Sequence, residues 1–345
     1  MAFSTTGVAA DDKWIIETVD RGEVGEYACH ISGSDGKIHI AYFDDFKGDL
    51  KHATRGPDGW NIERVDEDGT VGQYLSMTRD SLEQIYIGYR DQGKNRLKLA
   101  IFDGAAWKYE IVDTDPFASF DTSMCVDAQG KICISYFNYS AGCLKLATKE
   151  EDRWKIEVVD CGQHKSGAVG GFSSLKLDSK NRIHISYTDS IHGFLKYAVK
   201  ENGAWNIEIA DNSEFVGHYT SLALDEDGDP YISYTVDKSP NKPDLWFAKK
   251  VEGKWINELV DTANIAGNYN SIVIDRHCNV FISYSAMSKL KLAKNIQGSW
   301  SSEIIDPKGT VTYTTLSFDS DGAPHITYCD ARSALKYAHK GRRTI

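Results

Sequence analysis

The sequence predicts an all-β fold, a seven-bladed β-propeller with four antiparallel strands per blade, and three observations carry that prediction. Seven tryptophans recur at intervals of 45 to 51 residues along the 345-residue chain, a period typical of closed arrays of β-sheet repeats. Seven copies of a short strand end in a tyrosine that follows a small residue. Apolar residues alternate with a period of two, and no segment has helical periodicity. The repeated tryptophans are Trp14, Trp60, Trp107, Trp154, Trp205, Trp255 and Trp300, and Trp246 lies outside the series.

Each repeat contains the same elements in the same order. A strand led by tryptophan comes first, as in Trp14–Asp20, whose alternation with Glu17 outward indicates a half-exposed β-strand. A glycine-containing loop leads to a strand such as Tyr219–Leu224, and a tight turn follows in which glycine supplies a positive φ. The most regular strand comes next, for example Ile183–Tyr187, and a strand of the type Leu195–Ala198 ends the unit.

The two ends of the chain predict how the ring closes. The chain opens with a tryptophan strand at 13–19 and ends after Leu335–Ala338 without one of its own. The N-terminal strand should therefore complete the last blade and leave no open sheet edge. We expect one domain, residues 1–345, with blades at about 21–66, 67–113, 114–160, 161–211, 212–261, 262–306, and 307–340 plus 13–20.

Composition narrows the classes of partner. The 39 basic and 50 acidic residues give a net charge of −11, which opposes nucleic acid as a partner. No apolar run approaches the roughly 18 residues that a membrane span needs, so we expect no membrane partner. Residues 1–12 lack the pattern of a secretory signal. The expectation is a cytoplasmic protein, or the mature form of an exported one whose signal has been removed. The oligomeric state stays open.

The cysteines predict neither a zinc site nor a disulfide framework. They are odd in number and form no CxxC pair, so we expect reduced thiols. Cys125 and Cys133 flank a short turn symmetrically, which leaves a disulfide between them open. The seven cysteines are Cys29, Cys125, Cys133, Cys143, Cys161, Cys278 and Cys329.

Residue types that occur in every blade are interpreted first as packing devices. The seven strand tyrosines and the repeated tryptophans should be core residues. The acidic turns at 225–228 and 319–322 lack the ligand spacing of a calcium loop, and His39, His184 and His325 occupy one repeat position in different blades. We therefore expect hairpin turns, wall histidines, no metal and no cofactor. The tyrosines are Tyr42, Tyr89, Tyr136, Tyr187, Tyr234, Tyr284 and Tyr328.

The strands containing Ile-Ser-Tyr and the Leu-Lys-Tyr-Ala segments resemble the repeats of uncharacterised microbial propellers, and the overall plan is similar to propeller lectins. The resemblance spans the chain and implies a fold and, by association, ligand binding. The Ser-x-Asp-x-Gly-x-Thr-Trp boxes of sialidase-type propellers and the WD40 signatures are missing from the sequence.

A collar of aromatic residues is expected where the first strand of each blade begins, at the mouth of the central channel. Asp121 interrupts it once. The position before each collar residue varies from blade to blade, as a single site built from non-equivalent blades would require. The aligned pairs are Glu26-Tyr27, Gln73-Tyr74, Phe120-Asp121, Gly171-Phe172, His218-Tyr219, Asn268-Tyr269 and Thr312-Tyr313.

Further polar residues follow the second strand of each blade on the same face. Their acids are expected to cap loops through Asx turns, and Asp91 and Asp189 are also candidate ligand-binding residues. Arg90 is the only basic residue there and requires an acid opposite it, from a neighbour or from a ligand. Two insertions, at 161–171 and 236–244, should raise one side of the rim. They bring His164, Lys165, Lys238, Lys242, Pro240, Pro243 and the candidate Trp246.

Three functions follow from these residues. The first is a binding module in which collar aromatics and nearby polar groups hold a glycan or another small molecule. The second is a cofactor-independent lyase, isomerase or cyclase, with His218 as acid or base, Asp121 or Glu26 as the carboxylate partner, and Arg90 as the anion clamp. The third is a protein-interaction scaffold. An enclosed pocket in which His218, Asp121 and Arg90 converge would favour catalysis.

Overall fold

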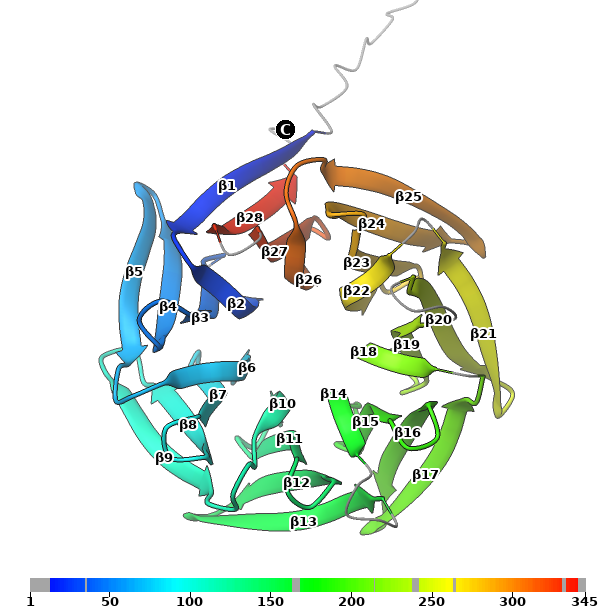
Figure 1. Cartoon of the computed structure of the whole chain (residues 1–345), viewed down its shortest axis with the longest axis horizontal. Coiled ribbons are helices and arrows are strands. Elements are labelled where there is room, and N and C mark those ends of the chain that lie inside the picture. Colours follow the sequence, from blue (N-terminus) through cyan, green and yellow to red (C-terminus); the bar gives the residue numbers. More distant parts are fainter. Residues whose placement is uncertain are drawn as a thin grey trace, which may run out of the picture.

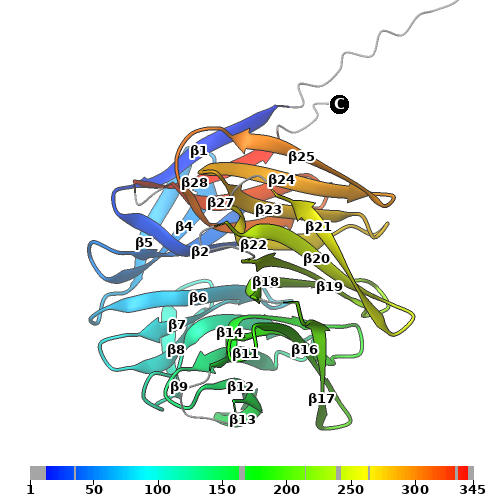
Figure 2. The same cartoon turned by 45° about the vertical axis from the view of Figure 1, so that its right-hand side comes forward.

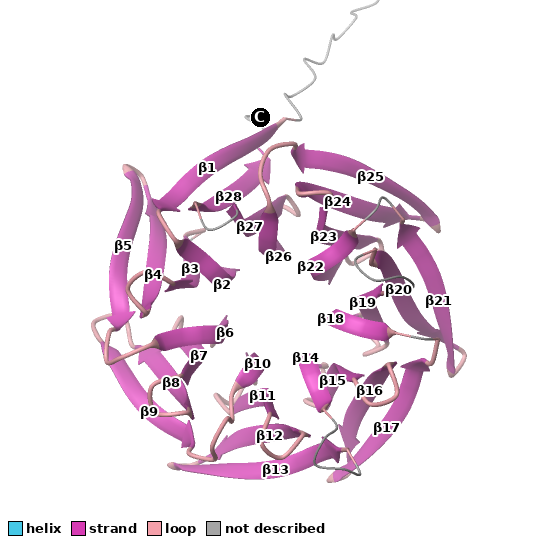
Figure 3. Ribbon diagram, in the orientation of Figure 1, coloured by secondary structure: helices cyan, strands magenta, loops and turns pink. Residues whose placement is uncertain are grey.

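Seven four-stranded antiparallel sheets surround a central axis in the computed structural model of the chain (Figure 1). The structure describes residues 13–34, 36–162, 168–213, 215–237, 242–262, 265–330 and 333–340. Every regular element in these ranges is a strand, and Figure 3 shows them as a ring of blades joined by short loops. The predicted seven-bladed propeller is confirmed. No helix among the described residues is long and apolar enough to cross a bilayer.

Each blade runs from an inner strand beside the channel to an outer strand at the rim (Figures 1 and 2). Blades one to four comprise β2(Val24–Ser32), β3(Ile38–Asp44), β4(Asp49–Gly56), β5(Gly59–Asp66); β6(Val71–Arg79), β7(Ile85–Asp91), β8(Arg96–Phe102), β9(Trp107–Asp113); β10(Phe120–Val126), β11(Ile132–Asn138), β12(Cys143–Glu150), β13(Arg153–Cys161); and β14(Val169–Leu177), β15(Ile183–Asp189), β16(Phe194–Glu201), β17(Ala204–Asp211). Blades five to seven comprise β18(Val216–Leu224), β19(Pro230–Val236), β20(Asp244–Val251), β21(Lys254–Asp261); β22(Ala266–Ile274), β23(Val280–Ala286), β24(Lys289–Ile296), β25(Ser299–Asp306); and β26(Val311–Phe318), β27(Pro324–Asp330), β28(Ala334–Lys340), with β1(Trp14–Arg21) as the outer strand.

The ring closes through strand β1, as predicted. It pairs antiparallel with β28 in the register Trp14↔Lys340 to Arg21↔Ala334, with one shift between Thr18 and Asp20. The seventh blade therefore takes its outer strand from the beginning of the chain, and this strand covers the edge of β28. A hydrogen bond also crosses the seam, the contact between neighbouring blades, to blade six: Trp14 Nε1 donates to Glu303 at 3.4 Å.

The core lies between neighbouring sheets, and the seven strand tyrosines form part of it as expected. All seven rings are fully buried. Each hydroxyl donates to the aspartate that ends, or nearly ends, the outer strand of the preceding blade, so the tyrosines also join blades. The pairs are Tyr42 with Asp20, Tyr89 with Asp66, Tyr136 with Asp113, Tyr187 with Asp160, Tyr234 with Asp211, Tyr284 with Asp261 and Tyr328 with Asp306.

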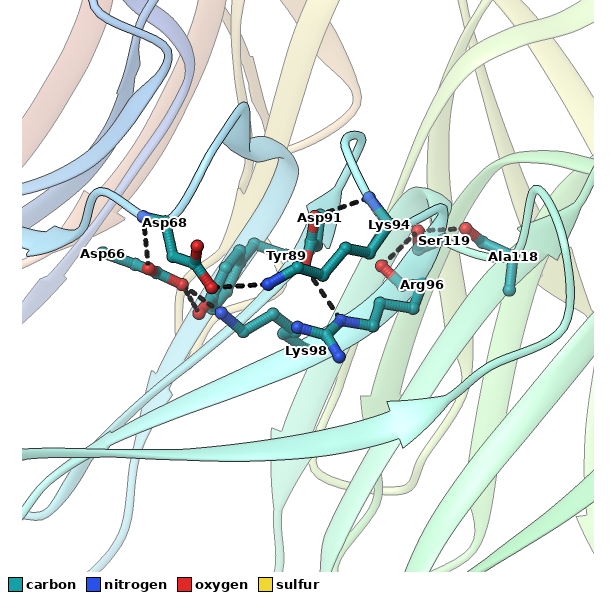
Figure 4. Close-up of polar contacts among 9 residues, drawn as sticks. All are labelled: Asp66, Asp68, Tyr89, Asp91, Lys94, Arg96, Lys98, Ala118 and Ser119. Carbon is teal, nitrogen blue, oxygen red and sulfur yellow. Dashed lines mark hydrogen bonds and ion pairs between the residues drawn. The ribbon is translucent and has the colours of Figure 1, made fainter.

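A lysine from the third strand joins most of these tyrosine–aspartate pairs, and we call the resulting group the seam latch. Figure 4 shows the latch between blades one and two, where Tyr89 and Lys98 both bind the Asp66 carboxylate. The carboxylate is almost fully buried, and bonds from Lys98 and Tyr89 hold its pKa below the ordinary value although burial acts to raise it. Trp246 occupies the lysine position in blade five. The lysine contacts are Lys51–Asp20, Lys98–Asp66, Lys145–Asp113, Lys196–Asp160, Lys291–Asp261 and Lys336–Asp306.

The repeated tryptophans pack against the core clusters, as expected, but they are only partly buried and lie at the seams between blades. Six donate their indole N–H to a glutamate on the outer strand of the preceding blade. This pairing turns the glutamate toward the seam, so the expectation that Glu17 points outward is wrong. Glu17 accepts from Trp60 Nε1 at 3.0 Å, whereas Ile15 and Ile16 of β1 are exposed.

The cysteines also depart from expectation. Cys143 and Cys161 form a disulfide between directly paired positions of β12 and β13, so the prediction of reduced thiols throughout is wrong for this pair. Antiparallel pairing brings their Cα atoms to 4.3 Å, a proximity that sequence spacing alone did not reveal. Cys125 and Cys133 do face each other across β10 and β11, as expected, and both are free thiols.

Candidate functional site

The collar is built from a repeated backbone irregularity at the channel mouth. In each inner strand the register with the second strand shifts at the collar residue, which adopts a left-handed conformation with φ between 49° and 56°. Bulky residues rarely adopt this conformation, so the surrounding sheet must enforce it. The seven positions are Tyr27, Tyr74, Asp121, Phe172, Tyr219, Tyr269 and Tyr313.

Glycines two residues earlier let the inner strand approach the preceding blade closely. A Cβ on Gly170 would lie 2.6 Å from Leu144 Cβ, and one on Gly72 would lie 2.9 Å from Leu50 Cα. Both glycines have positive φ, so a side chain there would meet a clash and an unfavourable backbone at once. The close approach fixes where the collar residues project.

The collar aromatics contact one another in sequence around the channel. Neighbouring ring centroids lie 4.5–5.0 Å apart and the rings are tilted by 44–56°. Burial raises the pKa of Tyr27, Tyr219 and Tyr313 well above the ordinary value, so these hydroxyls remain neutral donors. The chain of contacts runs through Phe172, Tyr219, Tyr269, Tyr313, Tyr27, Tyr74 and Phe120.

Asp121 stands at the remaining collar position, between the two ends of this aromatic chain. Its Oδ2 accepts from the backbone N–H of Phe172 at 2.9 Å. Burial raises the pKa of the Asp121 carboxyl, and the Phe172 N–H bond only partly opposes that effect. The carboxylate is therefore held in place but incompletely compensated.

The collar surrounds a cavity of about 590 Å³, a size typical of small-molecule sites. It extends from the channel toward the seam between blades three and four, where Phe137, Tyr139, Ala168 and Ser190 contribute to its wall. Besides these and the collar aromatics, its lining contains Ala28, Cys29, Leu75, Phe120, Asp121, Thr122, Gly171, Ser173, Thr220, Asn270, Thr314 and Thr315.

A row of small polar side chains directly follows the collar and supports it. In five blades this residue donates to the carbonyl oxygen of the preceding blade's collar residue, at 2.5–3.0 Å. These bonds satisfy carbonyls that the strand irregularity releases from the sheet ladder. Ala28 and Leu75 occupy the position in blades one and two. The five donors are Thr122, Ser173, Thr220, Asn270 and Thr314.

The structure does not bring the three proposed catalytic residues together in the cavity. Asp121 lines it, whereas His218 stacks on Phe172 at 5.5 Å and lies 3.9 Å from Asp237 Oδ2. Arg90 lies behind Phe120, with its guanidinium carbon 4.1 Å from the ring centroid.

Arg90 is almost fully buried and finds an amide where an acid was expected. Its Nη2 donates to Asn95 Oδ1 at 3.3 Å, and Nε has no hydrogen-bond partner among the described residues. Burial lowers the pKa of Arg90, although the nearby Tyr74 and Tyr27 hydroxyls act in the opposite direction. Gln73 lies opposite it across β6 and β7.

Other proposed site residues lie around the collar. Glu26 pairs in register with Phe43, and its charge adds to the raised pKa of Tyr313, after burial and Tyr269. Asn268 lies opposite Ser285 across β22 and β23. Neither residue is part of the cavity lining described above.

Asp91 and Asp189 are buried and bonded within their own blades. Asp91 accepts from Arg96 Nε at 2.8 Å and from the Lys94 backbone at 3.0 Å, as Figure 4 shows. Asp189 contacts Lys196 and His192, each at 3.0 Å. These bonds include the Asx turns that the sequence predicts, and neither aspartate contributes to the cavity lining.

Trp246 lies in β20, opposite Tyr234, and packs against the core between blades four and five. It does not contribute to the cavity lining either. Of the insertion residues, Lys242 and Pro243 are described, while His164, Lys165, Lys238 and Pro240 lie outside the described residues. The wall histidines His39, His184 and His325 each bond to the third strand of their own blade.

Sequence reasoning missed the polar row after the collar and the wall formed by Phe137 and Tyr139. The polar row has a signal in the sequence, since the residue after each collar position is small or polar in six blades. Tyr139 has none, because only the packing of blade three shows that its ring lies 5.8 Å from Phe120.

Comparison with known proteins adds information on the fold. No family model and no curated protein matches the sequence. Among solved structures, an ulvan lyase of a new polysaccharide lyase family, bound to -[GlcA(1-4)Rha3S]-, has a TM-score of 0.65 at 12% identity, over 94% of this chain and 95% of that one. A mutant of the Aleuria aurantia lectin in complex with Fucalpha1-6GlcNAc has a TM-score of 0.55 at 14% identity, over 84% and 98%.

A protein of unknown function from Dyadobacter fermentans has a TM-score of 0.59 at 11% identity, over 94% of this chain and 96% of that one. The TM-scores show that the chain shares a propeller fold with lectins, lyases and uncharacterised proteins. At identities this low, the likeness shows the fold alone. Activity has to be argued from the site itself.

Proposed function

We propose that this propeller binds one small organic ligand, a sugar or a molecule of similar size, in the collar cavity. The observation that carries the proposal is the cavity of about 590 Å³, which is lined by the collar aromatics and, among the described residues, by a single carboxylate. Rings of this kind stack on the apolar faces of a ligand, and a few polar groups set its orientation.

The asymmetry of the lining supports one site instead of seven equivalent ones. Asp121 has no counterpart in the other blades, and the cavity extends only toward the seam of blades three and four. Among the proteins of similar fold, the Aleuria aurantia lectin binds Fucalpha1-6GlcNAc and the ulvan lyase is a polysaccharide lyase, which makes a glycan a reasonable first ligand class to test.

Binding has more support than catalysis. An acid–base mechanism needs a second group within hydrogen-bond reach of the reacting atoms. His218 and Arg90 are separated from the cavity by Phe172 and Phe120, respectively, on which they stack. A scaffold role has less support than a ligand site because Asp121, which departs from the repeat, lines a cavity and does not lie on a flat face.

A glycan array followed by calorimetry tests the proposal. Tyr269→Asn removes one collar ring while keeping a residue that tolerates positive φ. Phe46→Asn is the matched control, since Phe46 is an exposed aromatic on a loop. We expect a hit to bind wild type and Phe46→Asn equally and Tyr269→Asn at least about tenfold more weakly. Equal binding to all three proteins would contradict the collar as the site.

A further inference from the structure

The charge of the collar cavity is one-sided. Asp121 is the only carboxylate that lines it, and none of its described lining residues is Lys, Arg or His. Burial raises the pKa of the Tyr27, Tyr219 and Tyr313 hydroxyls, so these three collar side chains are neutral. Among the described residues, a ligand in this cavity therefore meets one acid and a set of aromatic rings, and no basic side chain.

Within the described part of the chain, the Asp121 carboxylate forms no ion pair with a basic side chain. Its recorded bond is from the Phe172 N–H at 2.9 Å, and a carboxylate removed from water is costly unless a charge or several donors compensate it. A positive charge placed in the cavity would supply that compensation. The net charge of −11 would also draw cations toward the protein.

The aromatic walls next to Asp121 suit the same kind of group. Phe172 and Tyr219, with centroids 4.8 Å apart, flank the carboxylate on one side, and Phe120 and Tyr139, at 5.8 Å, form the other wall. Aromatic faces attract cations through their quadrupole, and enclosing sets of rings recognise quaternary ammonium groups.

The lining also favours methylated over primary ammonium groups. Ser173 and Thr220 already donate to backbone carbonyls, and Asp121 is the one charged acceptor. A primary ammonium has three N–H donors to satisfy, whereas a trimethylammonium group has none and presents methyl groups to the rings. Arg90 carries the nearby positive charge and stacks on Phe120, which places a bound cation nearer to Phe172.

We propose that the collar cavity binds an organic cation, with a methylated ammonium group against Asp121 and its methyl groups against the flanking aromatic rings. This inference rests on the proposed function, because it names the ligand class of the same cavity.

Choline and its uncharged carbon isostere, 3,3-dimethylbutan-1-ol, test the inference by calorimetry on the full chain. The two probes share shape and hydroxyl group and differ in charge. We expect choline to bind and the isostere to bind at least about tenfold more weakly. Equal affinity of the two probes, or no binding of choline at millimolar concentration, would overturn the inference, and both readouts need only the wild-type protein.

Two variants locate the charge. Asp121→Asn should weaken choline binding about tenfold or more while leaving the isostere unchanged. Asp45→Asn is the matched control, because Asp45 is an exposed acid whose N–H bonds to Glu23 O at 2.9 Å, on the loops around the same mouth. Choline affinity that survives Asp121→Asn, or that falls equally with Asp45→Asn, would contradict the assignment to Asp121.

Calorimetry with a panel of neutral sugars, run in parallel, distinguishes failure of the cation proposal from failure of the proposed ligand-binding function. One outcome is that a neutral sugar binds wild type but not Tyr269→Asn, while choline does not bind. This outcome would overturn the proposal of a cationic ligand and would leave the cavity as a binding site. Absence of binding by both the sugars and choline would count against the cavity as a small-molecule site, and so against both.

Discussion

The blade seams and the collar are both built from positions of the same repeat, but the residue types are uniform at the seams and vary at the collar. At the seams, a buried tyrosine binds an aspartate of the preceding blade in all seven copies. At the collar, six positions hold an aromatic residue and one holds Asp121. Repeated groups therefore hold the ring together, whereas a candidate ligand site is found where a repeated group has been replaced.

The largest expected effect breaks the seams at the point of closure. Deleting residues 1–20 removes most of β1 and opens the sheet that joins both ends of the chain. The deletion exposes the seventh blade's outer edge and its core, so we expect loss of the cooperative melt. Thermal denaturation followed by circular dichroism measures it. A truncated protein that melts cooperatively near the wild-type temperature would refute the role of β1 in closure.

The next effect compares a seam that has a lysine with one that does not. Asp66→Asn leaves the buried Lys98 ammonium without its counter-ion, and we expect a loss of about 3–5 kcal/mol in the free energy of unfolding. Asp211→Asn should cost only about 1–2 kcal/mol, since Trp246 occupies the lysine position there. Urea denaturation of both variants gives the difference, and equal losses would show that the lysine does not matter to the latch.

Acid should weaken the seams through buried histidines. Burial lowers the pKa of His30 to about 3, with the nearby His325 acting in the same direction, and it lowers the pKa of His184 and His325 as well. The ordinary pKa of histidine is about 6.5. Below that pH these histidines bind protons in the unfolded chain but not in the folded one, so the free energy of unfolding falls as the pH drops from 6.5 toward 3.

Urea denaturation between pH 7 and pH 5 measures this loss. His30→Gln keeps a polar group toward Ser317, which lies 2.7 Å from His30 Nε2, and should flatten the pH dependence. Stability that is constant over this range in the wild type would contradict burial of neutral histidines.

The smallest effect on stability is expected from a substitution that completes the aromatic collar. Asp121→Tyr gives blade three the residue that five other blades already accommodate with the same positive φ, so the free energy of unfolding should change by less than about 1 kcal/mol. Any ligand held by Asp121 should be lost, because the ring fills the gap and the charge disappears. Unchanged binding of a ligand found in the screens above would separate that ligand from Asp121.

The fold was predictable because its signals are periodic. Trp14 and the strand tyrosines set the count of blades, and the unpaired tryptophan strand at the start predicted closure. Periodicity did not predict which face a residue takes within a seam. Glu17 points toward the seam because Trp60 and Arg55 of blade one and His339 of its own blade bind it, and these partners become neighbours only when the ring closes.

The candidate site was predictable in part. The collar and the exception at Asp121 follow from alignment of the repeats, since both lie at fixed positions. The contacts of Arg90 with Phe120 and of His218 with Phe172 could not be predicted from the alignment, because they depend on side-chain packing between neighbouring blades. The Cys143–Cys161 disulfide has the same origin, as it joins two strands whose register no motif specifies.

The pairing of Trp14 with Lys340 sets an order of events in time. At a synthesis rate of roughly 5–20 residues per second, about twenty seconds to a minute separate the appearance of β1 from that of β28. During this interval six blades can form by pairing with their neighbours in the sequence, while β1 waits without a partner. A newly made chain therefore carries an unpaired strand until β28 has been made, and that strand can bind β28 of its own chain or of another.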